Sequence, residues 1–200
     1  MKQYFLLFLI VPGLISCNQR KANDTPSADK KVTIDIPELD TSLGPQVAII
    51  EFKVKAIRED LDVFADGFIH SISLDDPNPE LKRLSNADEI ILPYSSVSLV
   101  IDYPVRAPVV FQLTASGKGF SRKALLLQIS KTYRAMYEEE ESTASDKTIP
   151  AGERKGTYNR NQTNGKYGIW GHDLADLVLT LIEVHKNKSG KVTLILWVES

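Results

Sequence analysis

Hydrophobic and polar residues alternate along four stretches of the chain, residues 31–36, 46–57, 96–103 and 109–114. A period of two predicts β-strands that bury one face, so each stretch is expected to form a strand. Prolines separate the last two stretches, which predicts antiparallel neighbours. Residues 46–57 are apolar on both sides in their first half, which predicts a strand that starts in the interior and runs outward. Residues 75–89, which lie between the second and third of these stretches, are mostly polar and predict an irregular loop with one helical turn.

Turn residues predict two hairpins. The dipeptide Asp66-Gly67 divides residues 61–72 into two apolar segments, and Asp-Gly favours a two-residue turn because both positions need positive φ. Near the C-terminus, residues 177–184 and 192–198 are apolar at nearly every position and flank a turn-rich tetrapeptide. This second pattern predicts an interior hairpin in a sheet that is covered on both faces.

One long helix is predicted over residues 121–141. Ser121 is a good N-cap, and apolar residues then recur at steps of three and four, at Leu126, Ile129, Tyr133, Met136 and Tyr137. Such a stripe is expected to lie across one face of the sheet. The order of the elements predicts an α+β fold with a mostly antiparallel sheet, one major helix and a C-terminal β-hairpin. A β-sandwich with an attached helix is the alternative.

Composition limits the classes of function. The chain has 200 residues, of which 42% are hydrophobic, and this length suits one globular domain. Its 24 basic and 26 acidic residues give a formal net charge of -2. Because no strongly basic face is indicated, nucleic acid is not an expected partner.

The start of the chain predicts export. Residues 1–16 contain one basic residue and then an apolar run that is too short to span a bilayer, as in a signal peptide. The following Leu14-Ile15-Ser16-Cys17 resembles the lipobox of bacterial lipoproteins. The resemblance implies cleavage before Cys17 and a lipid on its sulfur, which anchors the protein to a membrane. The alternative is a secreted protein whose cleavage site happens to precede a cysteine.

The residues after Cys17 predict a tether followed by one domain. Residues 17–30 contain no large apolar side chain beyond the cysteine, so we expect a flexible segment that holds the domain about 20 Å from the membrane. Residues 31–200 are then one globular domain. Asn18 is not the aspartate that retains lipoproteins in the inner membrane of some bacteria, which favours the outer membrane.

The helix carries charges of unfavourable sign at its C-terminal end, where Glu138–Glu141 meet the negative end of the helix dipole. We expect compensation from inside the molecule, by Arg134 on the helix and by four basic residues of the following loop, Arg154, Lys155, Arg160 and Lys166. The alternative is a hard cation such as calcium, with Glu139, Glu140, Asp173 and Asp176 as its ligands. No other cofactor is indicated.

His172 and Asp173, followed by Asp176, are the only group with the look of a catalytic site. An imidazole beside carboxylates suits acid–base or metal chemistry, so these three residues and the helix glutamates define a hydrolase hypothesis. The competing interpretation is structural: Asp173 caps a single turn that ends at Asp176, and His172 closes the loop. The usual sequence motifs of nucleophilic and metal-dependent hydrolases are absent.

The loop over residues 158–176 also combines aromatic residues with glycines, which suits recognition of a protein or glycan. The binding candidates are Tyr158, Tyr167, Trp170 and His172. The alternative is that the aromatic side chains of this loop fold back into the core. We therefore expect a lipid-anchored envelope protein that acts as a binding or assembly module, with a hydrolase or a purely structural component as the other hypotheses.

Overall fold

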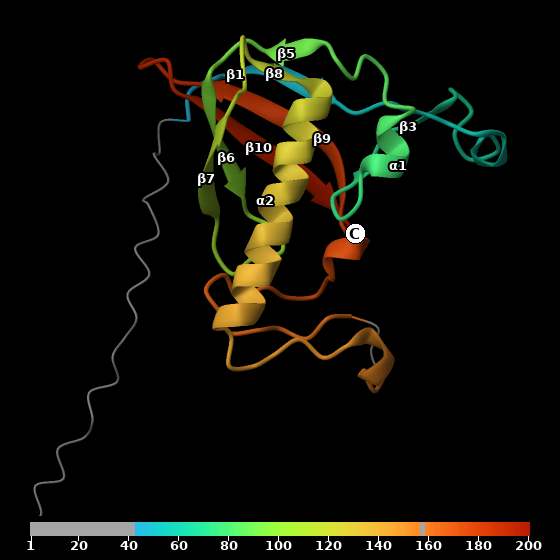
Figure 1. Ribbon diagram of the computed structural model, residues 1–200, viewed down its shortest axis with the longest axis vertical. Helices are drawn as coiled ribbons and strands as arrows, with labels where there is room; N and C mark the ends of the chain where they lie inside the picture. Colours follow the sequence, from blue (N-terminus) through green and yellow to red (C-terminus); the bar gives the residue numbers. More distant parts are fainter. Residues whose placement is uncertain (1–42, 157–158) are drawn as a thin grey trace, which may run out of the picture. The chain divides into compact units, whose positions relative to one another are not determined.

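The computed structural model of the chain describes residues 43–156 and 159–200. Its main feature is an open sheet crossed by one long helix (Figure 1). Five strands follow the order β1-β9-β10-β6-β7, and β4 pairs with β9 beyond the part that pairs with β1. The strands of this sheet are β1 (Gln46–Glu51), β4 (Ile72–Ser73), β6 (Ser96–Ile101), β7 (Val109–Thr114), β9 (Val178–Lys186) and β10 (Val192–Glu199).

The predicted α+β class is confirmed. All pairs of neighbouring strands in the large sheet are antiparallel except β10 and β6, which run parallel with Leu194 opposite Leu99. The β-sandwich alternative is wrong, because the remaining described strands form only two small sheets. These pair β2 (Val54–Lys55) with β3 (Phe68–Ile69), and β5 (Ile90–Leu92) with β8 (Phe120–Ser121).

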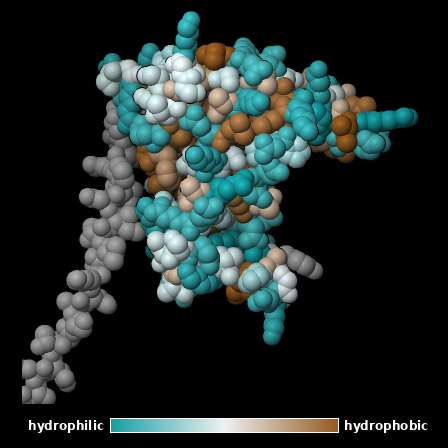
Figure 2. Space-filling view, viewed as in Figure 1, coloured by the Kyte–Doolittle hydropathy of each residue, from teal (hydrophilic) through white to brown (hydrophobic). Residues whose placement is uncertain are grey.

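Helix α2 (Arg122–Thr143) confirms the predicted helix and its N-cap. The backbone N–H of Ala124 donates to Ser121 Oγ over 3.2 Å, which satisfies one of the free donors at the helix start. The helix buries one stripe of side chains in the core, at Leu125, Leu126, Ile129, Tyr133 and Met136. The antiparallel pair β6–β7 and the hairpin β9–β10 are also as predicted. On the face shown in Figure 2, hydrophilic side chains predominate, and hydrophobic ones gather beside the upper half of α2.

Residues 46–57 were predicted to be buried at the start of the strand and exposed towards its end, and the structure shows the reverse. The strand is interrupted after Glu51, and the side chains of Val47 and Ile49 are 52% and 53% exposed. Burial begins only at Ile50 and continues at Phe52. The physical reason is position: β1 pairs with β9 alone among the described strands, so its first half lies at the edge of the sheet.

The hairpin predicted at Asp66-Gly67 is also wrong. β3 pairs with β2 instead of with residues 61–64, which fold into turns after a short 3-10 helix, Arg58–Asp60. Gly67 does adopt a positive φ of 80°. Asp66-Gly67 therefore does form a turn. The preceding segment is not a strand, because the Phe64 N–H donates to Asp60 O within a local turn and not to a neighbouring strand.

The expectation of a sheet covered on both faces is wrong for the C-terminal hairpin. Trp197 projects from the face opposite to α2 and is 51% exposed, because none of the described elements forms a second layer there.

Helix α1 (Asn78–Leu81) supplies the predicted helical turn in residues 75–89. The strand predicted at residues 31–36 lies outside the described residues. Within the described ranges, no helix combines the length and apolar character needed to cross a bilayer.

Candidate functional site

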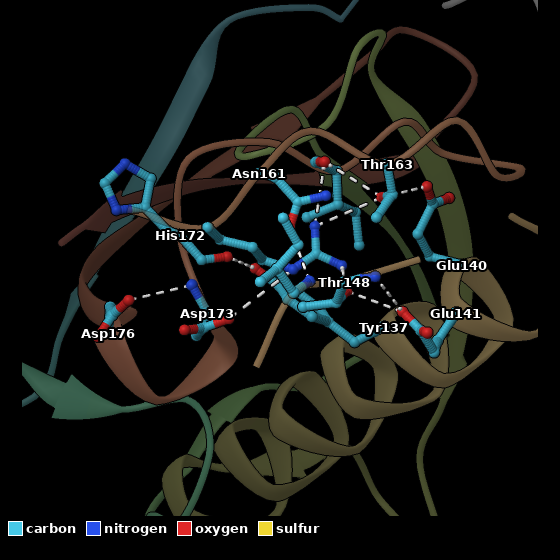
Figure 3. A network of polar contacts seen from close by, with 12 residues as sticks. Tyr137, Glu140, Glu141, Thr148, Asn161, Thr163, His172, Asp173 and Asp176 are labelled. Carbon is cyan, nitrogen blue, oxygen red and sulfur yellow. Dashed lines mark hydrogen bonds and ion pairs between the residues drawn. The ribbon is translucent and has the colours of Figure 1, made fainter. Parts of the chain in front are cut away.

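The candidate surface lies where the C-terminal end of α2 meets the long connection to β9. This connection contains two 3-10 helices, Ala151–Glu153 and Leu174–Asp176. Figure 3 shows side chains from the helix and from the connection converging on one polar network. The loop is therefore attached to the acidic helix end by several separate polar groups.

Glu140 is the centre of the contact between the helix and the loop. Its side chain is fully buried, and it accepts hydrogen bonds from Thr163 Oγ1 over 2.5 Å and from the backbone N–H of Gly165 over 2.8 Å. The N–H groups of Tyr167 and Gly168 add two further bonds, of 2.7 and 3.1 Å. The loop thus wraps its donors around one carboxylate, which satisfies a charge that burial would otherwise make costly.

The hydrogen bonds decide the protonation state of Glu140. Burial alone would raise the pKa of this carboxyl, but the bond from Thr163 and the three bonds from backbone N–H groups outweigh it and hold the pKa below its ordinary value. Gly165 is required here for space, since a Cβ at this position would lie 2.5 Å from Glu140 O. The close approach of loop and helix therefore depends on a glycine.

The two neighbouring glutamates also bind the loop. Lys166 Nζ lies 2.7 Å from Glu139 Oε1, and this bond is the main cause of the lowered pKa of Glu139. Glu141 accepts a bond of 2.7 Å from Thr148 Oγ1. The expected compensation by the loop is confirmed for Lys166. It is wrong for Arg134, which contacts Asp75 and not Glu138.

Asp173 belongs to a second ion-pair cluster. Arg154 Nη2 lies 2.7 Å from Asp173 Oδ2, and Arg160 Nε lies 3.8 Å from Asp173 Oδ1. Arg160 is buried and donates to Thr148 Oγ1 over 2.5 Å. Its guanidinium lies 5.5 Å from the centre of the Tyr137 ring. These two arginines were predicted to pair with the helix glutamates, but the structure places them on the loop carboxylate.

The three catalytic candidates do not form a common site. The His172 imidazole points away from the polar network in Figure 3, and its Nε2 lies 3.4 Å from Ser200 Oγ. Asp173 is held by arginine, and Asp176 accepts a bond of 3.0 Å from the backbone N–H of Asp173. Asp173 and Asp176 thus bracket the 3-10 helix, as the structural interpretation predicted.

The metal candidates are dispersed as well. Glu140 is surrounded by loop donors, Glu139 by Lys166, and Asp173 by Arg154. Among residues 43–156 and 159–200, no group of three or more His, Cys, Asp or Glu side chains is placed to hold a metal ion. Glu139, Glu140 and Glu141 therefore meet protein donors.

The binding candidates divide into buried and exposed residues. Tyr167 is buried, and its hydroxyl donates to Glu139, so its ring does not contribute to an exposed surface. Trp170 is 41% exposed and meets Tyr103 edge-on, with ring centres 5.5 Å apart. The His172 ring lies 5.5 Å from Tyr103 and 6.1 Å from Trp170. Tyr158 lies outside the described residues.

We call Tyr103, Trp170 and His172 the aromatic surface. Its backbone is fixed, because the Trp170 N–H donates to Pro104 O and the Tyr137 hydroxyl donates to His172 O, over 3.1 and 3.0 Å. Next to the arginine cluster lies an open hollow of about 590 Å³. It is lined by Tyr137, Glu138, Glu141, Ser142, Thr148, Arg160 and Asp173.

Two features of the site were missed in the sequence. Glu140 lies four residues after Met136, so it continues the buried stripe of α2, whereas Glu138, Glu139 and Glu141 do not. That spacing was the available signal for a buried carboxylate. Tyr103 has no such signal, because only the folded chain brings the end of β6 beside Trp170.

Comparisons with protein-family models, with curated proteins and with solved structures found no significant match for the chain. Function is therefore inferred from the geometry of the site and from the sequence.

Proposed function

We propose that this chain is a lipid-anchored protein of the bacterial cell envelope that acts as a binding or assembly module. Its ligand is another envelope protein, which contacts the aromatic surface. The lipid on Cys17 and the tether over residues 17–30 then hold the module near the membrane, with the outer membrane favoured by Asn18.

The observation that carries this proposal is the exposure of Trp170 on a rigid loop. Its neighbours Tyr167 and Ile169 are buried, and the Glu140 hydrogen bonds fix the loop that presents it. A solvated tryptophan loses little conformational entropy on binding when its backbone is already ordered. Tryptophan and tyrosine are also the residues that most often dominate the energy of protein interfaces.

The hydrolase hypothesis finds less support. An acid or base must reach a substrate with a free carboxylate or imidazole. Asp173 is paired with Arg154, Glu139 with Lys166, and Asp176 with a backbone N–H. These contacts support a structural role for the carboxylates, and they favour binding over acid–base catalysis.

The test is in-cell crosslinking followed by purification of the full-length lipidated protein. Trp170 and His172 are both changed to alanine, and Trp197→Ala is the matched control, because Trp197 is a comparably exposed tryptophan on the open sheet face. We expect a specific protein partner with the wild type and with Trp197→Ala, and its loss with the double variant. Cys17→Ser is expected to lose both membrane attachment and the partner.

A partner that persists in the double variant would place the interface elsewhere and contradict the proposal. No protein partner in any sample, together with a higher melting temperature on adding peptidoglycan fragments, would assign the surface to a glycan instead.

A further inference from the structure

A second hollow lies at the other end of α2. It has a volume of about 560 Å³ and separates β1 from β5. Its lining comes from β1, from the segment around Ser85, from β5 and from Arg122 at the start of α2. We call it the β1–β5 groove. It shares no residue with the aromatic surface, so a ligand of this groove is independent of the partner proposed for that surface.

The groove exposes apolar side chains from two strands. Ile49 of β1 is 53% exposed and Ile90 of β5 is 49% exposed, and both line the groove. Ile91 is half-buried beside them. Single exposed apolar residues are ordinary on protein surfaces, but a concave site that gathers several of them favours a ligand.

Two buried polar atoms in the groove residues have no hydrogen-bond partner within the described ranges, Ser85 Oγ and Arg122 Nε. The guanidinium of Arg122 is otherwise fixed, since Nη1 donates to Glu51 O over 2.5 Å and Nη2 to Glu89 Oε2 over 3.2 Å. Leaving a charged donor buried without an acceptor is costly. A ligand acceptor in the groove would remove this cost.

The backbone of β1 offers further hydrogen-bonding groups along the edge that no described strand pairs with. Because Glu51 O accepts the bond from Arg122, the hydrogen-bonding groups of Glu51 point away from β9. In an antiparallel ladder these directions alternate, so the N–H and C=O of Ile49 point outward too. An outward row of this kind is the template for adding a strand.

From these observations we propose that the β1–β5 groove binds an extended peptide segment of a partner protein, which adds to β1 as a strand. The peptide backbone bonds to Ile49 and offers a carbonyl to Arg122 Nε, and an apolar side chain lies between Ile49 and Ile90. The charged side chains here are already paired, Lys53 with Glu51 and Arg122 with Glu89, which favours an uncharged peptide backbone over an anionic ligand.

The test measures binding of a defined probe to the full chain in detergent. The probe is a fluorescein-labelled hexapeptide of alternating valine and threonine with blocked ends and a solubilising lysine tail. Its twin carries N-methyl groups on alternate amides, which removes the donors for a strand ladder and keeps the side chains. We expect saturable binding of the first peptide and at least about tenfold weaker binding of its twin.

Ile49→Pro tests the same bonds from the protein side. Proline removes the outward N–H of β1 and none of the bonds to β9, so the variant is expected to fold and to lose at least about tenfold in peptide affinity. Val63→Ala, at an exposed residue that does not line the groove, is the control and keeps wild-type affinity. Circular dichroism verifies the fold of each variant.

Several results would overturn the proposal: no saturable binding, equal affinity for both peptides, or wild-type affinity in a folded Ile49→Pro variant. If Ile49→Pro does not fold, the comparison of the two peptides on the wild-type chain still decides.

Discussion

The two ends of α2 meet the same electrostatic problem with different outcomes. Arg122 lies at the positive end of the helix dipole, and Glu138–Glu141 lie at its negative end. At the C-terminal end, Glu140 receives four hydrogen bonds and Glu139 pairs with Lys166. At the N-terminal end, Arg122 Nε is buried without a partner in the described part of the chain.

The charge of Glu140 therefore stabilises the fold, whereas the Arg122 guanidinium keeps a donor that a ligand could use. A buried carboxylate whose donors all come from the same chain orders the loop around it, and that loop presents Trp170. A buried guanidinium with one donor left over, beside exposed isoleucines and an open strand edge, is instead suited to a partner. Substitutions at each end of α2 test whether the two ends differ in this way.

The largest expected effect comes from Glu140→Ala. The variant leaves the donors of Gly165, Tyr167 and Gly168 without their acceptor in a buried position. We expect the free energy of unfolding to fall by about 3 to 4 kcal/mol, measured by urea denaturation. Near-ultraviolet circular dichroism is expected to report a disordered environment for Trp170.

Glu138→Ala is the matched control, because Glu138 belongs to the same run of glutamates and is exposed. It is expected to change stability by no more than about 0.5 kcal/mol. Equal losses in the two variants would show that the whole acidic run, and not the Glu140 contact, stabilises this end.

Gly165→Ala is expected to have the next largest effect. Its Cβ would lie 2.5 Å from Glu140 O and 2.7 Å from Glu140 Cδ, so the loop must move away from the helix. We expect a loss of about 2 kcal/mol. Gly152→Ala is the control, since a Cβ there meets nothing within 4 Å, and it is expected to be neutral within about 0.5 kcal/mol. A neutral Gly165→Ala would mean that the close contact is not needed.

Acid is expected to weaken the same contact. The pKa of Glu140 is held below its ordinary value of 4.5 in the folded protein, so the unfolded chain binds the proton more readily. The stability that this carboxylate contributes is complete above that value and is lost as the pH falls through the lower folded pKa. Urea denaturation across this range should give a steeper acid dependence in the wild type than in Glu140→Gln. Identical slopes would contradict the assignment.

The sequence predicted those features of the fold that depend on residues close together in the chain. The N-cap Ser121, the buried stripe of α2 and the antiparallel pairing of β6 with β7 were all visible in the sequence and are confirmed. The alternation predicted for β6 is wrong, because Ser98 and Val100 are buried as well as Val97, Leu99 and Ile101. The exposure of Val47 and Ile49 was not visible in the sequence, because an apolar run cannot reveal that its strand lies at the edge of a sheet. The parallel pairing of β6 with β10 depends likewise on contacts between distant segments.

The site shows the same limit. Sequence predicted that basic residues of the loop compensate the glutamates, which holds for Lys166, but it could not assign Arg154 and Arg160 to Asp173. It also grouped His172 with Asp173 because they are adjacent, whereas the loop turns their side chains to different neighbours. In an irregular segment, residues that are adjacent in the sequence need not point their side chains in the same direction.

The smallest expected effect belongs to the N-terminal end of α2. Ser85 Oγ is buried without a hydrogen-bond partner among the described residues, so Ser85→Ala removes an unsatisfied group and no described bond. We expect unchanged stability or a gain of up to about 1 kcal/mol in the absence of a ligand. Thr163→Val is the matched variant at the other end, where the hydroxyl donates to Glu140 over 2.5 Å, and a loss of about 2 kcal/mol is expected. A clear loss in Ser85→Ala would mean that this hydroxyl is already satisfied, and the contrast between the two ends of α2 would then rest on Arg122 Nε alone.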